Sequence, residues 1–86
     1  MVFESNIRID QNKLNLLLKK CNLSIERVIS EYDGSRQELR EILLGRAKVK
    51  NCMILNYICK NLGCRVQELF SDEVVEEIFY YGLARY

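Results

Sequence analysis

Apolar and polar residues follow one another along most of the chain with the three- and four-residue spacing of amphipathic helices. The first helix is expected over 10–21, where leucines stand at positions 14, 16, 17 and 18. Asp10 is placed to accept hydrogen bonds from the free amides of the first turn, and Ile9 to pack on Leu14 across that turn. Both features are typical of a helix start.

The pattern is interrupted after Cys21 and resumes at Ser24, which is a suitable cap for a second helix. We expect this helix to run to about Tyr32. Its apolar face contains residues spaced three and four apart, namely Ile25, Val28, Ile29 and Tyr32.

The residues at 33–35, Asp-Gly-Ser, predict a turn, because Gly accepts a positive φ and Asp tolerates one. Ser35 can cap the helix that follows, and Glu38 three residues later completes the pattern of a capping box. This third helix is expected to run to about Leu44. Gly45 is placed to end it in the left-handed conformation.

A basic connection over 46–50 leads to a fourth helix, which Asn51 can cap and Gly63 can end. The spacing of its apolar residues predicts one buried face. The residues expected on that face are Cys52, Leu55, Ile58, Cys59 and Leu62.

The two ends of the chain are read from shorter patterns. Residues 66–70 fit a short fifth helix, and Ser71 with the carboxylates after it fits one more helix start, since negative side chains suit the positive end of a helix dipole. The first nine residues partly alternate, which leaves a short strand, a packed arm or disorder open. The chain thus divides into an N-terminal arm or short strand at 1–9, a helical domain at 10–70 and a C-terminal helix at 71–86.

The composition narrows the class of protein. With 86 residues, of which 49% are hydrophobic and 29% charged, the chain is expected to form one globular domain. It contains no His and no Gly-rich phosphate loop, so we expect neither enzyme activity nor a cofactor. No apolar run approaches the ~20 residues of a membrane span, and the first residues lack the pattern of a signal peptide. These features predict a cytoplasmic protein without membrane contact.

The four cysteines stand at positions 21, 52, 59 and 64, without paired CxxC spacing. Cys52 and Cys59 are one heptad apart, which favours small buried core residues over metal ligands. Cys59 and Cys64 lie on the two sides of an expected helix end. A redox role for that pair stays open, although buried thiols are usually inert.

Two capped helices joined by a turn, the second amphipathic and followed by a basic stretch, are the pattern of a helix-turn-helix, with a plain helical bundle as the alternative. Over 14–70 the order of features resembles the Cro/C1-type (Xre-like) helix-turn-helix regulators of phages and bacteria. The matching pieces are LNLLLKKCNLS, SIERVISEYDGSRQELREILLG and ILNYICKNLGCRVQELF. The last piece is similar to the closing helices of small YozG-like members. The resemblance implies an all-α, five-helix, lambda-repressor-like domain, here with an extra C-terminal helix.

The resemblance also implies a sequence-specific, double-stranded-DNA-binding transcriptional regulator, a repressor of phage or mobile-element type. By position, its base-reading residues fall on Arg36, Gln37 and Glu41. The helical period agrees, since it points Gln37 and Glu41 away from the apolar side and places Arg40 at the edge. Such side chains can recognise base edges in the major groove. The residues expected to hold the DNA backbone are Ser35, Arg46, Lys48, Lys50 and Asn51.

Two departures from the family pattern affect this interpretation. Ile25 replaces a Gln that grips phosphate, and Ile29 replaces a small residue where the second and third helices touch. The charge is divided unevenly, because residues 1–50 hold ten basic and seven acidic residues and residues 51–86 hold three and five. The resulting basic half suits DNA, but a pI near 7.6 predicts weak binding by a monomer.

The C-terminal helix offers a device for dimerisation. Its apolar strip can pack on its own chain or form a two-fold interface, in which case two recognition helices would stand about 34 Å apart on a palindromic operator. The acidic third helix and the aromatic tail also suit a second function, in which the fold binds another regulator as an anti-repressor or inhibitor. The dimer or partner surface is expected at Val74, Val75, Ile78, Phe79 and Tyr81.

Overall fold

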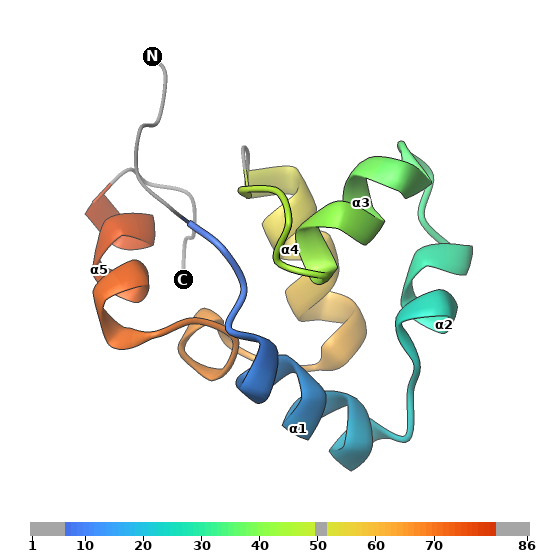
Figure 1. Ribbon diagram of the computed structural model, residues 1–86, viewed down its shortest axis with the longest axis horizontal. Coiled ribbons are helices and arrows are strands. Elements are labelled where there is room, and N and C mark those ends of the chain that lie inside the picture. Colours follow the sequence, from blue (N-terminus) through green and yellow to red (C-terminus); the bar gives the residue numbers. More distant parts are fainter. Residues whose placement is uncertain (1–6, 50–51, 81–86) are drawn as a thin grey trace.

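The computed structural model describes residues 7–49 and 52–80, and all regular secondary structure in these ranges is helical (Figure 1). The expected all-α class is therefore confirmed for the described residues. No helix among them is long and apolar enough to cross a membrane. The elements are α1 (Gln11–Cys21), α2 (Ile25–Ser30), α3 (Arg36–Leu43), α4 (Cys52–Leu62), the 3-10 turn η1 (Val66–Glu68) and α5 (Asp72–Tyr80).

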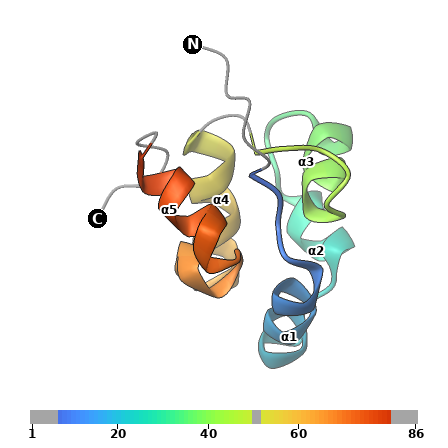
Figure 2. The same ribbon diagram turned by 60° about the vertical axis from the view of Figure 1, so that its left-hand side comes forward.

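Helix α4 runs through the middle of the arrangement, with α1, α2 and α3 on one side and α5 on the other (Figures 1 and 2). Every element contributes to one apolar core, and no polar or charged side chain among the described residues is buried. The fully enclosed side chains include Ile7, Leu14, Leu39, Ile42, Leu43, Val49, Leu55, Ile58, Leu69, Phe70 and Ile78.

Three of the expected N-caps, at Asp10, Ser24 and Ser35, form as the sequence predicts. The Asp10 carboxylate accepts from the second and third amides of α1 at 3.0 and 3.1 Å. Ser24 accepts from the Arg27 amide and Ser35 from the Glu38 amide, both at 3.2 Å. Each bond satisfies an amide that has no partner inside its own helix, which fixes where α1, α2 and α3 begin.

Three helices end in the same way. Asn22, Gly45 and Gly63 have φ values of 54°, 76° and 61°, and they follow α1, α3 and α4. The amide of each of these residues and the amide after it turn back to carbonyls of the last helical turn, at 2.9 to 3.4 Å. This is the Schellman motif, which satisfies carbonyls that the helix itself leaves free. The left-handed caps expected at Gly45 and Gly63 are thereby confirmed.

The Schellman motif also sets the side chain after the left-handed residue beside the one five positions earlier. The closing backbone bonds are 2.9 Å in α1, 2.9 Å in α3 and 3.0 Å in α4. The three side-chain pairs differ in chemistry, being two leucines, an ion pair and two thiols. They are Leu18–Leu23, Glu41–Arg46 and Cys59–Cys64.

Two expected helices are shorter than the sequence suggested. Helix α2 ends at Ser30 rather than near Tyr32. At this end the Ser30 hydroxyl donates to the Arg27 carbonyl at 2.8 Å, and the Tyr32 amide donates to the Ile29 carbonyl at 3.0 Å, a tighter turn than that of an α-helix. The expected helix over 66–70 is a single 3-10 turn, η1, after which Leu69 and Phe70 are buried in the core.

The prediction that Cys52 and Cys59 lie on the buried face of the fourth helix was wrong for Cys52. Cys21 and Cys52 are exposed, and Cys59 and Cys64 are only partly buried. Cys52 is the first residue of α4 and lies before its buried stretch, which begins at Ile54. The cap expected at Asn51 lies outside the described residues.

The segment before α1 is extended and packs into the core. Ile7 and Ile9 are buried, and the Ile7 carbonyl accepts from the Val49 amide at 2.8 Å. The Asp10 amide donates to the Leu69 carbonyl at 2.9 Å. Residues 7–9 therefore join the α3–α4 connection to the end of η1 without forming a strand, and residues 1–6 of the expected arm lie outside the described residues.

Alanine at the two left-handed glycines tests the capping scheme. Gly63→Ala should cost about 1–2 kcal/mol, since only the positive φ opposes it and no atom lies within 4 Å of the added Cβ. Gly45→Ala should cost about 1 kcal/mol more, because its Cβ would stand 2.9 Å from Gln11 Nε2 and displace the amide from its 2.9 Å bond to the Leu43 carbonyl. Urea unfolding measures both. Equal losses, or none, would contradict this account.

Candidate nucleic-acid interface

The α2–turn–α3 unit is held in place by its inner side. Val28 and Ile29 of α2 are buried, as are Leu39, Ile42 and Leu43 on one face of α3. The large side chain at position 29 is only 2% exposed, so the core accommodates it where the family pattern has a small residue. The unit thus has one apolar side that packs against the core and one polar side that faces outward.

The outer side of α3 is not covered by the described part of the chain. Arg36, Gln37 and Glu38 are exposed, and Arg40 and Glu41 are partly exposed. The helical period pointed Gln37 and Glu41 outward and placed Arg40 at the edge. Gln37 is exposed as expected, but the Glu41 side chain is only 32% exposed, less than the 37% of Arg40, and the first turn of α3 is the most accessible part. The structure therefore brings the four expected base-reading residues onto one outward face.

Glu41 is already engaged within the chain. Its Oε1 accepts from Gln37 Nε2 at 3.3 Å, and its Oε2 lies 3.5 Å from Arg46 Nη1. The second contact is the side-chain pair of the α3 Schellman motif. The positive guanidinium of Arg46 consequently offsets the negative charge of Glu41 at the end of α3.

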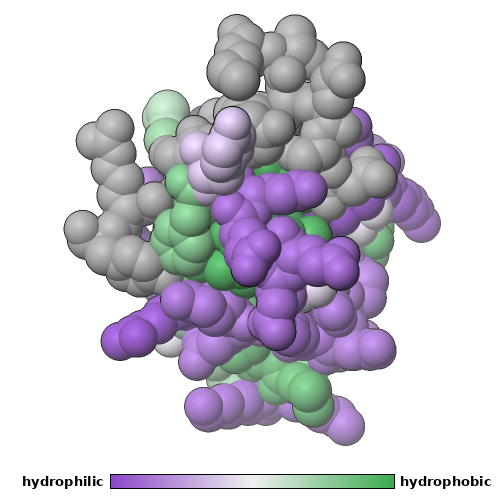
Figure 3. Space-filling model, turned by 90° about the vertical axis from the view of Figure 1, so that its left-hand side faces the viewer, coloured by the Kyte–Doolittle hydropathy of each residue, from purple (hydrophilic) through white to green (hydrophobic). Residues whose placement is uncertain are grey.

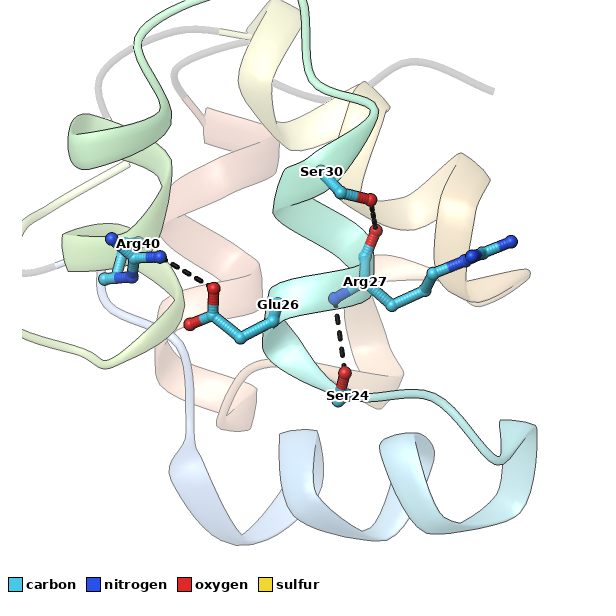
Figure 4. Close-up of polar contacts among 5 residues, drawn as sticks. All are labelled: Ser24, Glu26, Arg27, Ser30 and Arg40. Atoms are coloured by element: carbon cyan, nitrogen blue, oxygen red, sulfur yellow. Dashed lines mark hydrogen bonds and ion pairs between the residues drawn. The ribbon is translucent and has the colours of Figure 1, made fainter.

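Arg40 joins α3 to α2. Its Nη2 lies 2.8 Å from Glu26 Oε2, whereas Arg27, the neighbour of Glu26, extends from the other side of α2 (Figure 4). The two partners of the ion pair are 37% and 72% exposed, so water screens much of their attraction. Sequence reasoning did not find this pair because its partners are 14 residues apart and lie on different helices.

The expected backbone contacts are placed at the two ends of α3. Ser35 is exposed at the beginning, and Arg46 and Lys48 follow the end. Arg8 was not expected there, yet its Nη1 donates to the Gly45 carbonyl at 2.9 Å, which brings a further positive charge to the end of α3. No sequence signal marked Arg8, because only folding brings residues 8 and 45 together. Lys50 and Asn51 lie outside the described residues.

Helix α2 is also tied to α4. The Tyr57 hydroxyl donates to the Val28 carbonyl at 2.7 Å, and the rings of Tyr57 and Tyr32 lie 4.8 Å apart between centroids. Burial, together with the nearby Glu31 and Tyr32, raises the pKa of Tyr57 above its usual value of about 10. The neutral phenol is favoured because burial and the negative charge of Glu31 both disfavour the phenolate.

The expected dimer or partner surface on α5 is divided between core and surface. Ile78 is fully buried in its own chain, and Val74 and Val75 are partly buried against the core. Phe79 is 37% exposed and Tyr80 is 82% exposed. Viewed from this side, the hydrophobic surface is broken by hydrophilic side chains (Figure 3). Tyr81 lies outside the described residues.

The described residues hold no group of three or more His, Cys, Asp or Glu side chains arranged for a metal ion. The outer face of α3, by contrast, combines guanidinium, amide and hydroxyl groups that can bond to base edges and phosphates.

A scan against protein-family models found no match to the chain, and neither did searches of curated proteins and of solved structures.

A double-mutant cycle measures the tie between α2 and α3. Glu26→Ala and Arg40→Ala should show a coupling free energy of roughly 0.2–1 kcal/mol in urea unfolding, because the pair is well exposed, and high salt should reduce it. The matched cycle of Glu31→Ala with Arg40→Ala removes the same charges without that pair and should show no coupling. Similar coupling in both cycles would contradict the assignment.

The Tyr57 hydroxyl should make stability fall at high pH. Its raised pKa means that the folded chain holds the proton more tightly, so this stability is complete below about pH 10 and is lost as the pH rises through the folded-state pKa. At neutral pH, Tyr57→Phe should lower the free energy of unfolding by about 1 kcal/mol relative to the parent chain. Above pH 10 the free energy of unfolding should fall less steeply in the variant than in the parent chain. Urea unfolding from pH 7 to 11 checks this, and parallel curves would count against it.

Proposed function

We propose that this chain is a sequence-specific DNA-binding transcriptional regulator, a repressor of phage or mobile-element type, that places α3 in the major groove. The observation that carries the proposal is the two-sided character of α3. Its inner face is locked in the core by Leu39, Ile42 and Leu43, while its first turn presents Arg36 and Gln37 without cover from the described chain. A rigid helix with such a face meets the geometric need of groove recognition.

The two side chains at the start of α3 supply the base-reading chemistry. A guanidinium such as that of Arg36 can donate two hydrogen bonds to guanine, and an amide such as that of Gln37 can pair with adenine. The Gln37 amide bonds to Glu41 across a single turn of the exposed helix, at 3.3 Å. That bond is long for a hydrogen bond, so exchange for a base edge costs little.

Phosphate contacts are available at both ends of α3. Ser35 uses an oxygen lone pair to cap the helix, and its hydroxyl hydrogen remains available for a phosphate oxygen. Arg8, Arg46 and Lys48 supply positive charge at the far end, where Arg46 also balances Glu41. This arrangement supports a helix held by its two ends, with its middle turned towards the bases.

The acidic residues of α3 define the conditions for binding. Glu41 has a cationic partner within the chain, whereas Glu38 is exposed and faces the solvent. With few phosphate contacts per chain, binding should be weak at physiological salt and should strengthen as salt is lowered. The proposal places the protein in the cytoplasm, together with DNA. A homodimer on a palindromic operator, which would double the contacts, stays a prediction.

Arg36 and Gln37 test the proposal directly. After selection of bound sequences from a random duplex pool, Arg36→Ala and Gln37→Ala should each weaken binding to the selected duplex by roughly 5- to 100-fold, since a good base pairing gives about 1–3 kcal/mol of discrimination. Both should relax the sequence preference at one position. Fluorescence anisotropy with a labelled duplex at low salt measures the affinities.

The matched control is Arg27→Ala, which removes the same charge from the exposed part of α2 that points away from Arg40 (Figure 4). It should change affinity by less than about threefold, because it alters only the long-range field. If no duplex is selected at low salt, or if Arg27→Ala weakens binding as much as Arg36→Ala, DNA reading by α3 is wrong.

A protein-binding role is the second candidate, in which the chain acts as an anti-repressor or inhibitor of another regulator. The exposed aromatic side chains at the end of α5, Phe79 and Tyr80, favour it. Deleting the tail would not test this role, because Ile78 belongs to the core. The discriminating variant is Tyr80→Ser. If α5 binds the partner regulator, this variant should abolish its capture. If the chain acts through α3 on DNA, the variant should bind DNA like the parent chain.

A further inference from the structure

The Schellman motif at the end of α4 places two thiols side by side. Gly63 supplies the left-handed turn, and the Cys64 amide donates to the Cys59 carbonyl at 3.0 Å. In this motif the residues that carry the bonded amide and carbonyl commonly make an apolar side-chain contact. In α1 the corresponding positions hold Leu18 and Leu23, and both pack against the core.

The thiol pair is accessible as well as close. Cys59 and Cys64 pack against the core but keep part of their surface exposed, and no disulfide joins them. Cys21, on the neighbouring end of α1, directs its thiol to the Leu62 carbonyl at 3.4 Å. Cys52 is exposed at the opposite end of α4. The end of α4 therefore holds one thiol pair set together by the backbone, with the Cys21 thiol nearby and hydrogen-bonded to the Leu62 carbonyl.

We infer that Cys59 and Cys64 form a reactive dithiol site, which low-molecular-weight disulfides convert to an intramolecular disulfide across the end of α4. This goes beyond the proposed DNA binding and does not depend on it. In Figure 1 the end of α4 lies near α1 and continues into η1, and it is separated from the start of α3. The bridge would thus fix the α4–η1 junction and leave the recognition face of α3 unchanged.

The reaction proceeds by two exchanges. The Cys59 thiolate attacks one sulfur of the small disulfide R–S–S–R, forms a mixed disulfide and expels one R–S⁻. Cys64, after losing its proton, attacks the Cys59 sulfur and expels the second R–S⁻. Each released thiolate takes up one proton, so two protein thiols become one disulfide while R–S–S–R becomes two R–SH.

The two sulfurs have distinct roles. The hydrogen bond from the Cys64 thiol lowers the pKa of Cys59, against burial and the nearby Glu68 carboxylate. The same hydrogen bond, with burial, raises the pKa of Cys64. The lower pKa gives Cys59 the larger thiolate fraction of the two, so we assign Cys59 as the attacking sulfur and Cys64 as the resolving one.

Equilibration of the reduced full chain with oxidised and reduced glutathione tests the site. Mass spectrometry should show the loss of two hydrogen atoms, and peptide mapping should join Cys59 to Cys64. Cys52→Ser, the matched control on the same helix, and Cys21→Ser should behave like the parent chain. Cys59→Ser and Cys64→Ser should instead accumulate a glutathione adduct on whichever thiol of the pair remains. Far-ultraviolet circular dichroism is the control that each variant is folded.

A second measurement tests whether the folded helix end, and not only the short distance along the sequence, favours the disulfide between residues 59 and 64. In concentrated urea the Schellman turn is lost, and the equilibrium constant for forming the 59–64 disulfide in glutathione buffers should fall by about tenfold or more. A stable glutathione adduct on the parent chain, a bridge that includes Cys21, or an equal constant in urea would each overturn the inference.

Discussion

The structure depends above all on how its helices end. The last four carbonyls of a helix have no partner inside it, and α1, α3 and α4 meet this need with one left-handed residue after each helix. The same turn reverses the chain within a few residues, so three helices of 8 to 11 residues can pack on one core. The turn after α4 is also what brings Cys64 back beside Cys59.

A second constraint sets the orientation of α3, and it acts through α2. Helix α2 has only six residues and cannot hold its position alone. The buried side chains of α2 and the hydrogen bond from Tyr57 to Val28 fix it against α4, and α3 then packs beside it with the ion pair at the edge. Apolar packing carries most of this stability, because an exposed ion pair contributes little.

Local chemistry made much of the fold predictable. The caps at Asp10, Ser24 and Ser35 and the stops at Gly45 and Gly63 follow from residue types and their spacing, so the starts of α1 to α3 and the ends of α3 and α4 were read correctly. The early end of α2 was missed because the apolar spacing continues to Tyr32, which packs against the core from the turn that follows the helix. The exposure of Cys52 was missed because the period of a helix defines a face but does not tell where the core ends.

The candidate interface was predictable to a smaller extent, because its electrostatics are not local. The helical period identified the outward face of α3, but the partners of its charges come from distant parts of the chain, as with Arg40 and Glu26 or Arg8 and Gly45. These contacts determine which charged side chains of α3 already have a partner within the chain. Arg40 is committed to α2 and Glu41 to Arg46, so the freely presented chemistry of α3 is concentrated in its first turn. The inner face of α3 is fixed by apolar packing and its first turn is open, so the proposed DNA binding would read only a few adjacent base pairs.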